Sequence, residues 1–294
     1  MFSASWVVCL VLASQAFAAC TRAMLQDAAA AYVKAQAAGS PSMPALASNV
    51  SYLENDATTD IKTGVLSQPI TIDFNRSLYD TTQCATFTEL SAATNKKSYI
   101  IHTRMLFTDD KITTIQSVVT TTGDWAFNAT GQLYWNKQEV WDTIPESKRD
   151  TRAIIKAASD AYLDSWGDGT VKVPYGAPCA RLEGGSYTAG KGSTTNTCKM
   201  PQFPQPFKIT NRRYVVDEEV GGVDIFNDFP FIEKTKPDGT PTRPHECLRK
   251  SVSSAVSESV TSEEPGVLAI ADPDDALIAT HLLRVICFGL NLMR

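Results

Sequence analysis

The chain has 294 residues, is 43% hydrophobic and carries a formal net charge of −5 at pH 7. An acidic balance without a run of basic residues argues against a nucleic-acid partner, because binding to phosphates needs clustered Lys and Arg. The apolar fraction is sufficient for two ordinary hydrophobic cores.

Residues 1–18 predict an export signal. A short apolar run over residues 6–17 ends in Ala16-Phe17-Ala18, the pattern of small residues that a signal peptidase accepts, although no Lys or Arg precedes the run. The run is too short for a transmembrane helix, so we expect no stable membrane span. The predicted localisation is secreted, either extracellular or within the secretory pathway.

In the first half of the mature chain we expect a helix followed by strands. Apolar side chains recur at helical spacing over residues 22–38, and residues 44–50 predict a linker or a short helix, followed by a strand or turn over 51–55. Residues 70–74 alternate as a half-buried strand. Longer alternation over 99–107, a turn at Asp109-Asp110 and a β-branched run over 111–121 predict an antiparallel hairpin. The aromatic residues after it are expected in the core or in a lid: Trp125, Phe127, Trp135 and Trp141.

The second half repeats this plan. Identical residues recur at one constant offset along the chain, pairing Arg22 with Arg152, Ala23 with Ala153, Ala28 with Ala158, Ala31 with Ala161, Tyr32 with Tyr162 and Gly39 with Gly169. A second helix is expected over 151–166, then a Gly-, Ser- and Thr-rich loop over 184–196 and strands over 212–217 and 223–229.

We therefore divide the chain into a signal (1–18), a first unit (19–147), a second unit (148–250) and an atypical C-terminal tail (251–294). The tail is Ser-rich and then apolar, which fits an amphipathic helix, a disordered terminus or a lipid-anchor signal. A helix followed by long antiparallel strands, occurring twice, predicts the α+β class.

The cysteines and sequons support export. Removal of Cys9 with the signal leaves an even number of cysteines without a C-x-x-C pair, and the three histidines are far apart, so we predict disulfides and no metal site. The favoured pairs are Cys179–Cys198, across the Gly-rich loop, and Cys20–Cys84, between the first helix and its sheet. The expected glycosylation sites are Asn49, Asn75 and Asn128, each in an N-x-[ST] sequon.

Several runs resemble one family of secreted fungal proteins of unassigned function. They are YLEN at 52–55, CATFTEL at 84–90, PCARLEGG at 178–185 and NRRYVVDE at 211–218. That family is similar to the SnoaL-like, ketosteroid-isomerase-like superfamily of α+β cones, and the resemblance covers residues 20–236. It implies two fused cone-shaped units, each with a helix packed on a curved antiparallel sheet, in a monomer that acts as a pseudo-dimer. The departure lies at the C-terminus, where the family's closing strand is not recognisable.

The superfamily resemblance implies acid–base chemistry by an Asp, Glu or His without a cofactor. No superfamily motif matches position by position, so the candidates come from the repeat: Glu54 and Glu183 occupy equivalent places after the helices. Arg181 could hold a carboxylate or bind an oxyanion. Asp217 beside Arg212 and Arg213, and His102 within a strand, complete the candidate set. Each has a structural alternative, namely an ion pair for the carboxylates and a partly exposed strand position for His102.

Two functions remain open. The first is a cofactor-free isomerase or cyclase acting on a small apolar molecule, such as a fungal secondary metabolite; the second is a secreted binding or interaction protein without turnover. A third, structural possibility is that one unit only completes the other. Common hydrolase, metalloprotease, kinase and Rossmann motifs are absent from the sequence. A carboxylate facing an enclosed apolar cavity would favour the enzyme, and pairing with arginines would favour binding.

Overall fold

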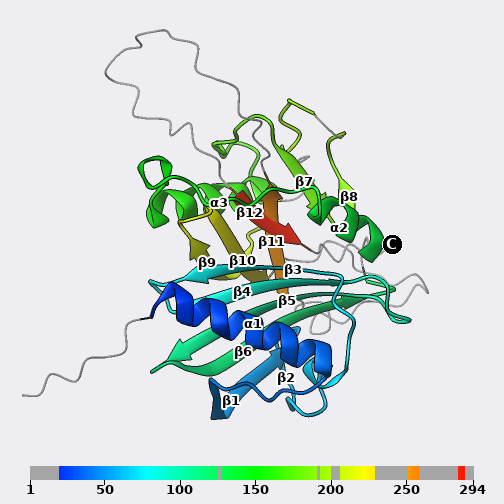
Figure 1. Cartoon of the computed structure of the whole chain (residues 1–294). Coiled ribbons are helices and arrows are strands. Elements are labelled where there is room, and N and C mark those ends of the chain that lie inside the picture. Colours follow the sequence, from blue (N-terminus) through cyan, green and yellow to red (C-terminus); the bar gives the residue numbers. More distant parts are fainter. Residues whose placement is uncertain are drawn as a thin grey trace, which may run out of the picture.

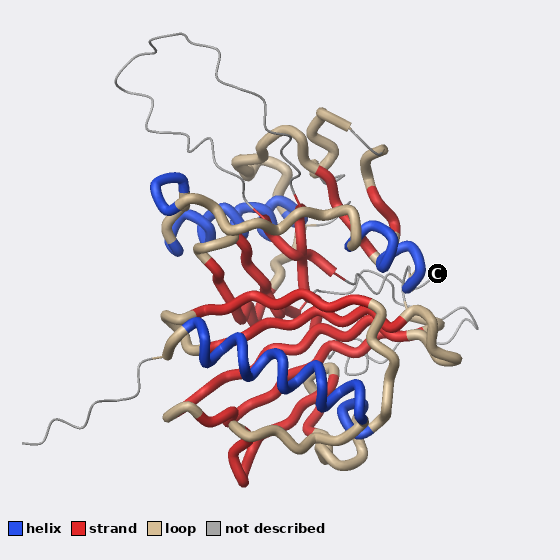
Figure 2. The backbone as a smooth tube through the Cα atoms, viewed as in Figure 1, coloured by secondary structure: helices blue, strands red, loops and turns tan. Residues whose placement is uncertain are grey.

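The computed structural model describes residues 20–124, 127–190, 193–199 and 206–228, together with the backbone of 251–257 and 284–288. The predicted signal and Trp125 lie outside these ranges. The described chain is α+β, with mainly antiparallel sheets and few helices, as predicted (Figures 1 and 2).

The first sheet has six strands in the order β2-β1-β6-β5-β4-β3. Its pairings are antiparallel except for β1 with β6, which is parallel. The strands are β1 (Leu46–Glu54), β2 (Ala57–Thr58), β3 (Phe74–Asp80), β4 (Ala85–Ala92), β5 (Tyr99–Thr108) and β6 (Lys111–Thr121). The β5–β6 hairpin is confirmed, and its turn residues Asp109 and Asp110 have φ of 49° and 61°, a region that Asp tolerates better than most residues. The short 3₁₀ helix η1 (Val65–Ser67) follows β2.

The helix α1 (Arg22–Ala38) covers one face of this sheet (Figure 1). Thr21 caps its N-terminus by accepting a hydrogen bond from the Met24 amide, and Gly39 ends it in the left-handed region at φ 62°. The buried stripe of the helix packs into the first apolar cluster, together with side chains of η1 and the sheet.

The helix α3 (Arg152–Gly167) is built in the same way. Thr151 caps it by accepting from the Ile154 amide, and its buried stripe matches that of α1 at the predicted offset. Leu25, Ala28 and Tyr32 of α1 correspond to Ile155, Ala158 and Tyr162 of α3, and every one of these side chains is buried.

The second sheet also has six strands, in the order β8-β7-β11-β12-β10-β9. They are β7 (Ala180–Glu183), β8 (Ser186–Tyr187), β9 (Thr210–Asp217), β10 (Gly222–Asp228), β11 (Ser251–Ser257) and β12 (Arg284–Phe288). The outer pairs β8-β7 and β10-β9 take the places that β2-β1 and β4-β3 have in the first sheet. The two central strands come from the predicted tail, so these residues form strands and not the amphipathic helix that was one of the expectations for it. Their directions differ from those of β6 and β5: β12 is parallel to β10, whereas β11 is antiparallel to β7.

Three local predictions were wrong. Residues 44–50 do not form a linker or helix, because β1 begins at Leu46 and pairs with β6. The strand predicted at 70–74 begins only at Phe74, since the Asp73 carboxylate accepts from the Thr94 amide (2.9 Å) and hydroxyl (2.7 Å) in a loop. His102 is not partly exposed but 2% exposed, because it lies beside Phe87 on the face of the first sheet that packs against the second unit.

The molecule has three apolar clusters that follow its layers. One lies between α1 and the first sheet, and one lies between α3 and the second sheet. The third joins both units, since it combines Leu78 and Phe87 of the first sheet with Val215 and Phe226 of the second. The sheets therefore pack against each other, with a helix on the outer face of each.

Two ion pairs cross between the units in a reciprocal pattern. Arg22, the first residue of α1, binds Asp217 at the end of β9 through Nη1–Oδ1 (2.8 Å) and Nη2–Oδ2 (3.0 Å). Arg152, the first residue of α3, binds Asp80 at the end of β3 through Nη1–Oδ1 (2.6 Å).

Hydrogen bonds from backbone amides to the same two carboxylates follow this reciprocal pattern. Asp217 Oδ2 accepts from the Tyr79 amide (3.0 Å), and Asp80 Oδ2 accepts from the Val216 amide (2.9 Å). Asp217 of β9 thus binds β3, the strand that carries Asp80, and Asp80 in turn binds β9. The side chains of Asp80 and Asp217 are 0% and 1% exposed, so their charges depend on these partners.

Both predicted disulfides are present. Cys20–Cys84 ties the start of α1 to the β3–β4 turn, and Cys179–Cys198 links the residue before β7 to the segment after β8. Both Cα–Cα distances are 5.6 Å, within the usual range for a disulfide.

Removal of the arginine from either of these two ion pairs between the units will destabilise the fold. We expect Arg22→Ala and Arg152→Ala each to lower the free energy of unfolding by about 3 kcal/mol, because each leaves a buried carboxylate without its cation. Urea unfolding measures this. The control is Lys156→Ala, which removes an exposed pair with Asp160 (46% and 25% exposed) and should change stability by less than about 1 kcal/mol. Equal effects of the three substitutions would contradict the assignment.

The two disulfides should differ in their contribution. Their sequence separations are 64 and 19 residues, so chain entropy predicts a larger loss for the longer loop. We expect Cys20→Ala/Cys84→Ala to cost about 4 kcal/mol and Cys179→Ala/Cys198→Ala about 3 kcal/mol, measured by chemical denaturation without reductant. The reverse order would show that effects in the folded state outweigh loop entropy.

Candidate functional site

Glu54, at the end of β1, is held by its own unit. Its Oε1 accepts from the Tyr52 hydroxyl (2.5 Å) and from the Val65 amide. Burial and the hydrogen bond to Glu54 raise the pKa of Tyr52, so the phenol remains the donor at neutral pH. The carboxylate therefore joins η1 to β1.

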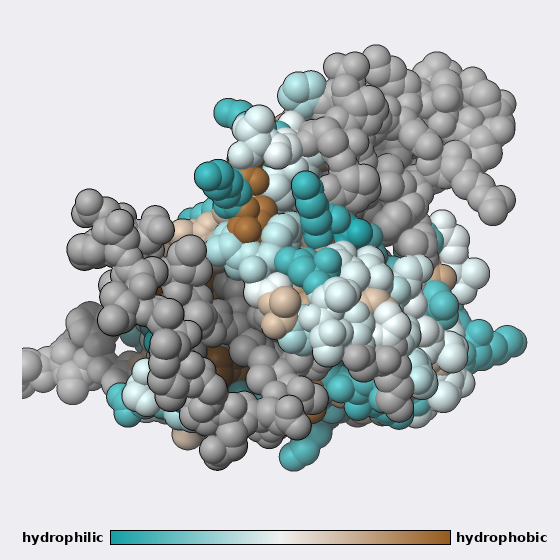
Figure 3. Space-filling model, turned by 90° about the horizontal axis from the view of Figure 1, so that it is seen from above, coloured by the Kyte–Doolittle hydropathy of each residue, from teal (hydrophilic) through white to brown (hydrophobic). Residues whose placement is uncertain are grey.

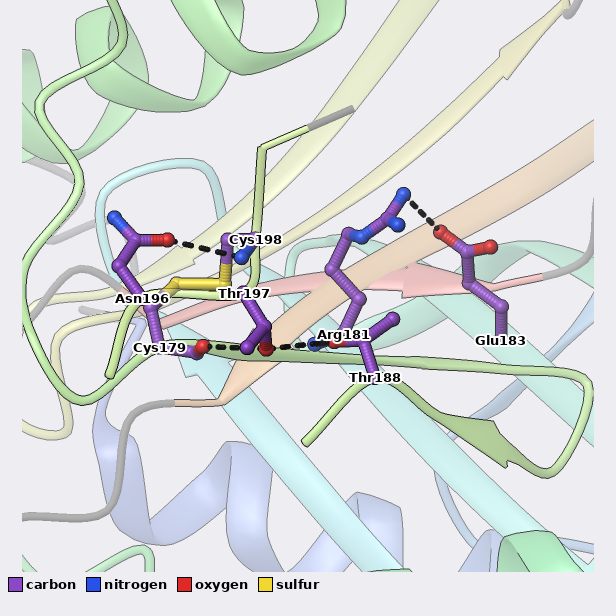
Figure 4. The surroundings of a disulfide bond; sticks show 7 residues. All are labelled: Cys179, Arg181, Glu183, Thr188, Asn196, Thr197 and Cys198. Atoms are coloured by element: carbon purple, nitrogen blue, oxygen red, sulfur yellow. Dashed lines mark hydrogen bonds and ion pairs between the residues drawn. A yellow bond between two sulfur atoms is a disulfide. The ribbon is translucent and has the colours of Figure 1, made fainter. Parts of the chain in front are cut away.

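Arg181 and Glu183 form an ion pair on β7. The Arg181 Nη1–Glu183 Oε1 distance is 3.0 Å, and the side chains are 10% and 17% exposed (Figure 4). The pair lies beside the β7–β8 turn, where Gly184 and Gly185 have positive φ values that favour glycine.

The same region is held by hydroxyl groups. Thr188 Oγ1 accepts from the Arg181 amide (2.8 Å) and lies 3.0 Å from Thr197 Oγ1 (Figure 4). Thr197 in turn donates to the Cys179 carbonyl (2.9 Å), next to the disulfide. The arrangement of Arg181 and Glu183 is that of a structural ion pair beside a tight turn.

Asp217 pairs with neither neighbouring arginine. Arg212 binds Asp160 (2.8 Å) and Asp164 (2.5 Å) of α3, and Arg213 binds Asp56 in the first unit (2.8 Å). Asp217 belongs instead to the exchange with Arg22. Glu54, Glu183 and Asp217 thus lie in separate networks, each with a partner that explains its position.

His102 leads to a residue that the sequence analysis did not select. The β4–β5 register places Glu89 directly opposite His102, on the face of the first sheet that meets the second unit. Their Nε2–Oε1 distance is 3.9 Å, and their side chains are 3% and 0% exposed. The ring of His102 also meets Phe87 edge-to-face, with centroids 5.5 Å apart.

Glu89 is the centre of a buried polar network. Arg76 Nη2 donates to its Oε2 (2.9 Å), and Gln132 Nε2 (3.1 Å) and Asn136 Nδ2 donate to its Oε1. Gln132 and Asn136 come from α2 (Ala129–Asn136), the helix after the β5–β6 hairpin. A second carboxylate, Glu139, accepts from Arg76 Nη1 (2.8 Å). We call Arg76, Glu89, His102, Gln132, Asn136 and Glu139 the Glu89 cluster.

An aromatic ring borders the cluster. The Arg76 guanidinium lies 4.3 Å from the ring centroid of Trp141, and Trp141 Nε1 donates to Glu139 Oε2 (3.0 Å). The cluster is therefore polar inside and aromatic at this edge.

The protonation states at neutral pH follow from burial and charge. Burial opposes ionisation of Glu89, but Arg76, His102 and the two amides together lower the pKa of its carboxyl. Burial lowers the pKa of His102 to about 4, against the opposing influence of Glu89. Glu89 is thus an anion and His102 is neutral.

Glu89 could not be selected from sequence alone. It stands within the 84–90 run that carries the family resemblance, but the spacing to His102 has no meaning until β4 and β5 are paired in register. Its three donors come from β3 and α2, which no sequence pattern joins to β4.

Among the described residues, no group of three or more His, Cys, Asp or Glu side chains could hold a metal ion. No helix in the same part of the chain is long and apolar enough to cross a membrane.

Comparison with known proteins gives one match. Residues 148–264 match the model of a family described as a domain of unknown function, DUF8021, which begins where we place the second unit. Neither the curated proteins nor the solved structures contain a match. The matched region includes Arg181, Glu183 and Asp217 but not Glu54, Glu89 or His102.

The buried neutral histidine makes stability depend on pH. The folded pKa of His102 (about 4) lies below its unfolded value of about 6.5, so the unfolded chain binds more protons between these values and stability falls as pH decreases through this window. We expect a loss of roughly 1.5 kcal/mol between pH 6.5 and pH 5, measured by urea unfolding. His102→Gln should remove this part of the slope; an unchanged slope would show that other groups cause it.

Proposed function

We propose that this chain is a secreted protein that binds a small molecule without converting it. The observation that carries the proposal is that Glu54, Glu183 and Asp217, the carboxylates predicted for acid–base catalysis, each have a structural partner. A catalytic base must be free to reach its substrate, whereas these groups brace turns and unit contacts.

Electrostatics supports binding over turnover. In the described part of the chain, the carboxyl groups whose pKa shifts are all lowered: Asp73, Glu89, Asp160 and Asp168. Acid–base catalysis near neutral pH instead relies on carboxyls with raised pKa values. His102, with a pKa of about 4, is also a weak base at that pH.

The proposal includes the pseudo-dimer. Two cone-like units of one ancestral α+β module, fused in a monomer and related by a pseudo-twofold axis, would exchange contacts in pairs. The reciprocal pairs Arg22–Asp217 and Arg152–Asp80, and the common spatial plan of the two sheets, support this arrangement. It agrees with the resemblance to secreted fungal proteins of the SnoaL-like superfamily.

Secretion is part of the same proposal. The two disulfides are compatible with an extracellular protein. Asn49, Asn75 and Asn128, the predicted glycosylation sites, are all exposed, so a glycan at any of them would not disturb the core.

A cofactor-free isomerase or cyclase acting on an apolar metabolite is the second candidate. It is favoured by one observation, the buried Glu89–His102 pair, which places a carboxylate and an imidazole side by side. In this candidate, Glu89 would be the base.

Native mass spectrometry separates the two candidates. The secreted full chain is incubated with a metabolite extract from its culture medium and repurified, and we expect a bound small molecule that is released with unchanged mass. Glu89→Gln and the control Glu183→Gln are treated alike. Conversion of the molecule by the wild type and by Glu183→Gln, but not by Glu89→Gln, would contradict binding without turnover and support the enzyme. Absence of any bound or converted molecule would contradict both candidates.

A further inference from the structure

The helix α2 covers the Glu89 cluster with a polar face. Its buried residues are Ala129, Gln132 and Asn136, so two amides take the places where a covering helix normally has large apolar side chains. Separation of the Gln132 and Asn136 side chains from the sheet exposes no large apolar side chain of this face, and water can replace their hydrogen bonds. Among the described helices, α2 is therefore the one whose buried face is suited to lift from its sheet.

Two buried atoms of the cluster lack hydrogen-bond partners within the described residues. They are Arg76 Nε, a donor, and Gln132 Oε1, an acceptor. Both side chains converge on Glu89, through Arg76 Nη2 (2.9 Å) and Gln132 Nε2 (3.1 Å). A buried polar atom without a partner is unfavourable, so these atoms indicate a partner of complementary chemistry. A hydroxyl group is such a partner, because it accepts one hydrogen bond and donates another.

Aromatic rings lie on the same helix and beside it. Trp135 of α2 stacks on Tyr187 of β8, with centroids 4.1 Å apart and planes at 15°. Tyr134 meets Trp135 edge-to-face at 5.0 Å and is 49% exposed. Figure 1 shows α2 beside β7 and β8, where the two units meet.

The exposed apolar side chains concentrate at this place. In the described chain, the large hydrophobic residues that are exposed are Tyr134, Val140 and Ile154, and the first two lie on or just after α2. On the face seen in Figure 3, most of the described residues are coloured white to teal, and a few are brown.

The charges select against an anionic ligand. The cluster combines the Arg76 guanidinium with the Glu89 and Glu139 carboxylates, so negative charge is in excess while His102 is neutral. A phosphate or a carboxylate would be repelled, and an uncharged molecule would not.

We infer that α2 covers a binding site for an uncharged, hydroxyl-rich small molecule of the monosaccharide class, which enters when the helix lifts from the first sheet. Hydroxyl groups of the ligand bind Arg76 Nε and Gln132 Oε1, and its C–H face packs on the aromatic rings beside α2. This inference rests on the proposed binding function and specifies its site and ligand class.

Tryptophan fluorescence of the full chain tests the site, because Trp135 and Trp141 border it. The probes are glucose, galactose, mannose and N-acetylglucosamine, of which at least one should give a saturable change. Gln132→Met should raise the dissociation constant about tenfold, the effect of one lost hydrogen bond of about 1.4 kcal/mol. The matched control is Gln36→Met: Gln36 is also 0% exposed, donates its amide and has Oε1 without a partner within the described residues, but it lies on α1.

Hydrogen exchange of the wild-type protein tests whether α2 covers the site and lifts from the sheet, without any substitution. Amides of α2 should exchange faster than those of α1, and the bound sugar should slow exchange in α2 alone. No binding of any of the four sugars, equal effects of the two Gln substitutions, or unchanged exchange in α2 would overturn the inference. If the metabolite experiment still finds a bound molecule that Gln132→Met does not affect, the binding function stands and this site is wrong.

Discussion

The architecture depends on the exchange of two arginine–aspartate pairs between the units. Asp80 and Asp217 each end an edge strand, lose nearly all contact with solvent and bind both the first arginine of the opposite unit's helix and an amide of the opposite strand. A buried carboxylate is unfavourable without such partners. The exchange therefore selects one relative placement of the sheets, since a shift of either strand would leave both charges unpaired.

That placement creates an intersheet layer with two characters. Its centre is apolar, formed by side chains such as Phe87 and Phe226. Beside Phe87, the same face of the first sheet carries His102 and Glu89, whose polar groups are satisfied by Arg76 and by amides from α2. The apolar part stabilises the association of the units. The polar part brings charged and amide side chains together at one position next to α2.

The two proposals follow from how each polar group is satisfied. Glu54 and Glu183 each have a partner within their own unit and brace the fold. In the Glu89 cluster, two buried atoms whose side chains bind Glu89, Arg76 Nε and Gln132 Oε1, have no partner within the described chain. Lowered pKa values keep Glu89 charged and His102 neutral at neutral pH, which suits stable hydrogen bonding better than proton transfer.

The sequence by itself determined the local elements. Apolar spacing predicted α1 and α3, alternation predicted the β5–β6 hairpin, and the positions of the cysteines favoured both disulfides, because these signals depend on neighbouring residues or on chain connectivity. Only the tertiary structure decided that Asp217 binds Arg22 rather than Arg212 or Arg213, that Glu89 faces His102, and that β11 and β12 occupy the centre of the second sheet. Such partners are set by strand register and by the packing of the two sheets, and the alternatives look equally good in sequence. A one-residue shift in register would turn Glu89 to the opposite face of its sheet without changing any local pattern.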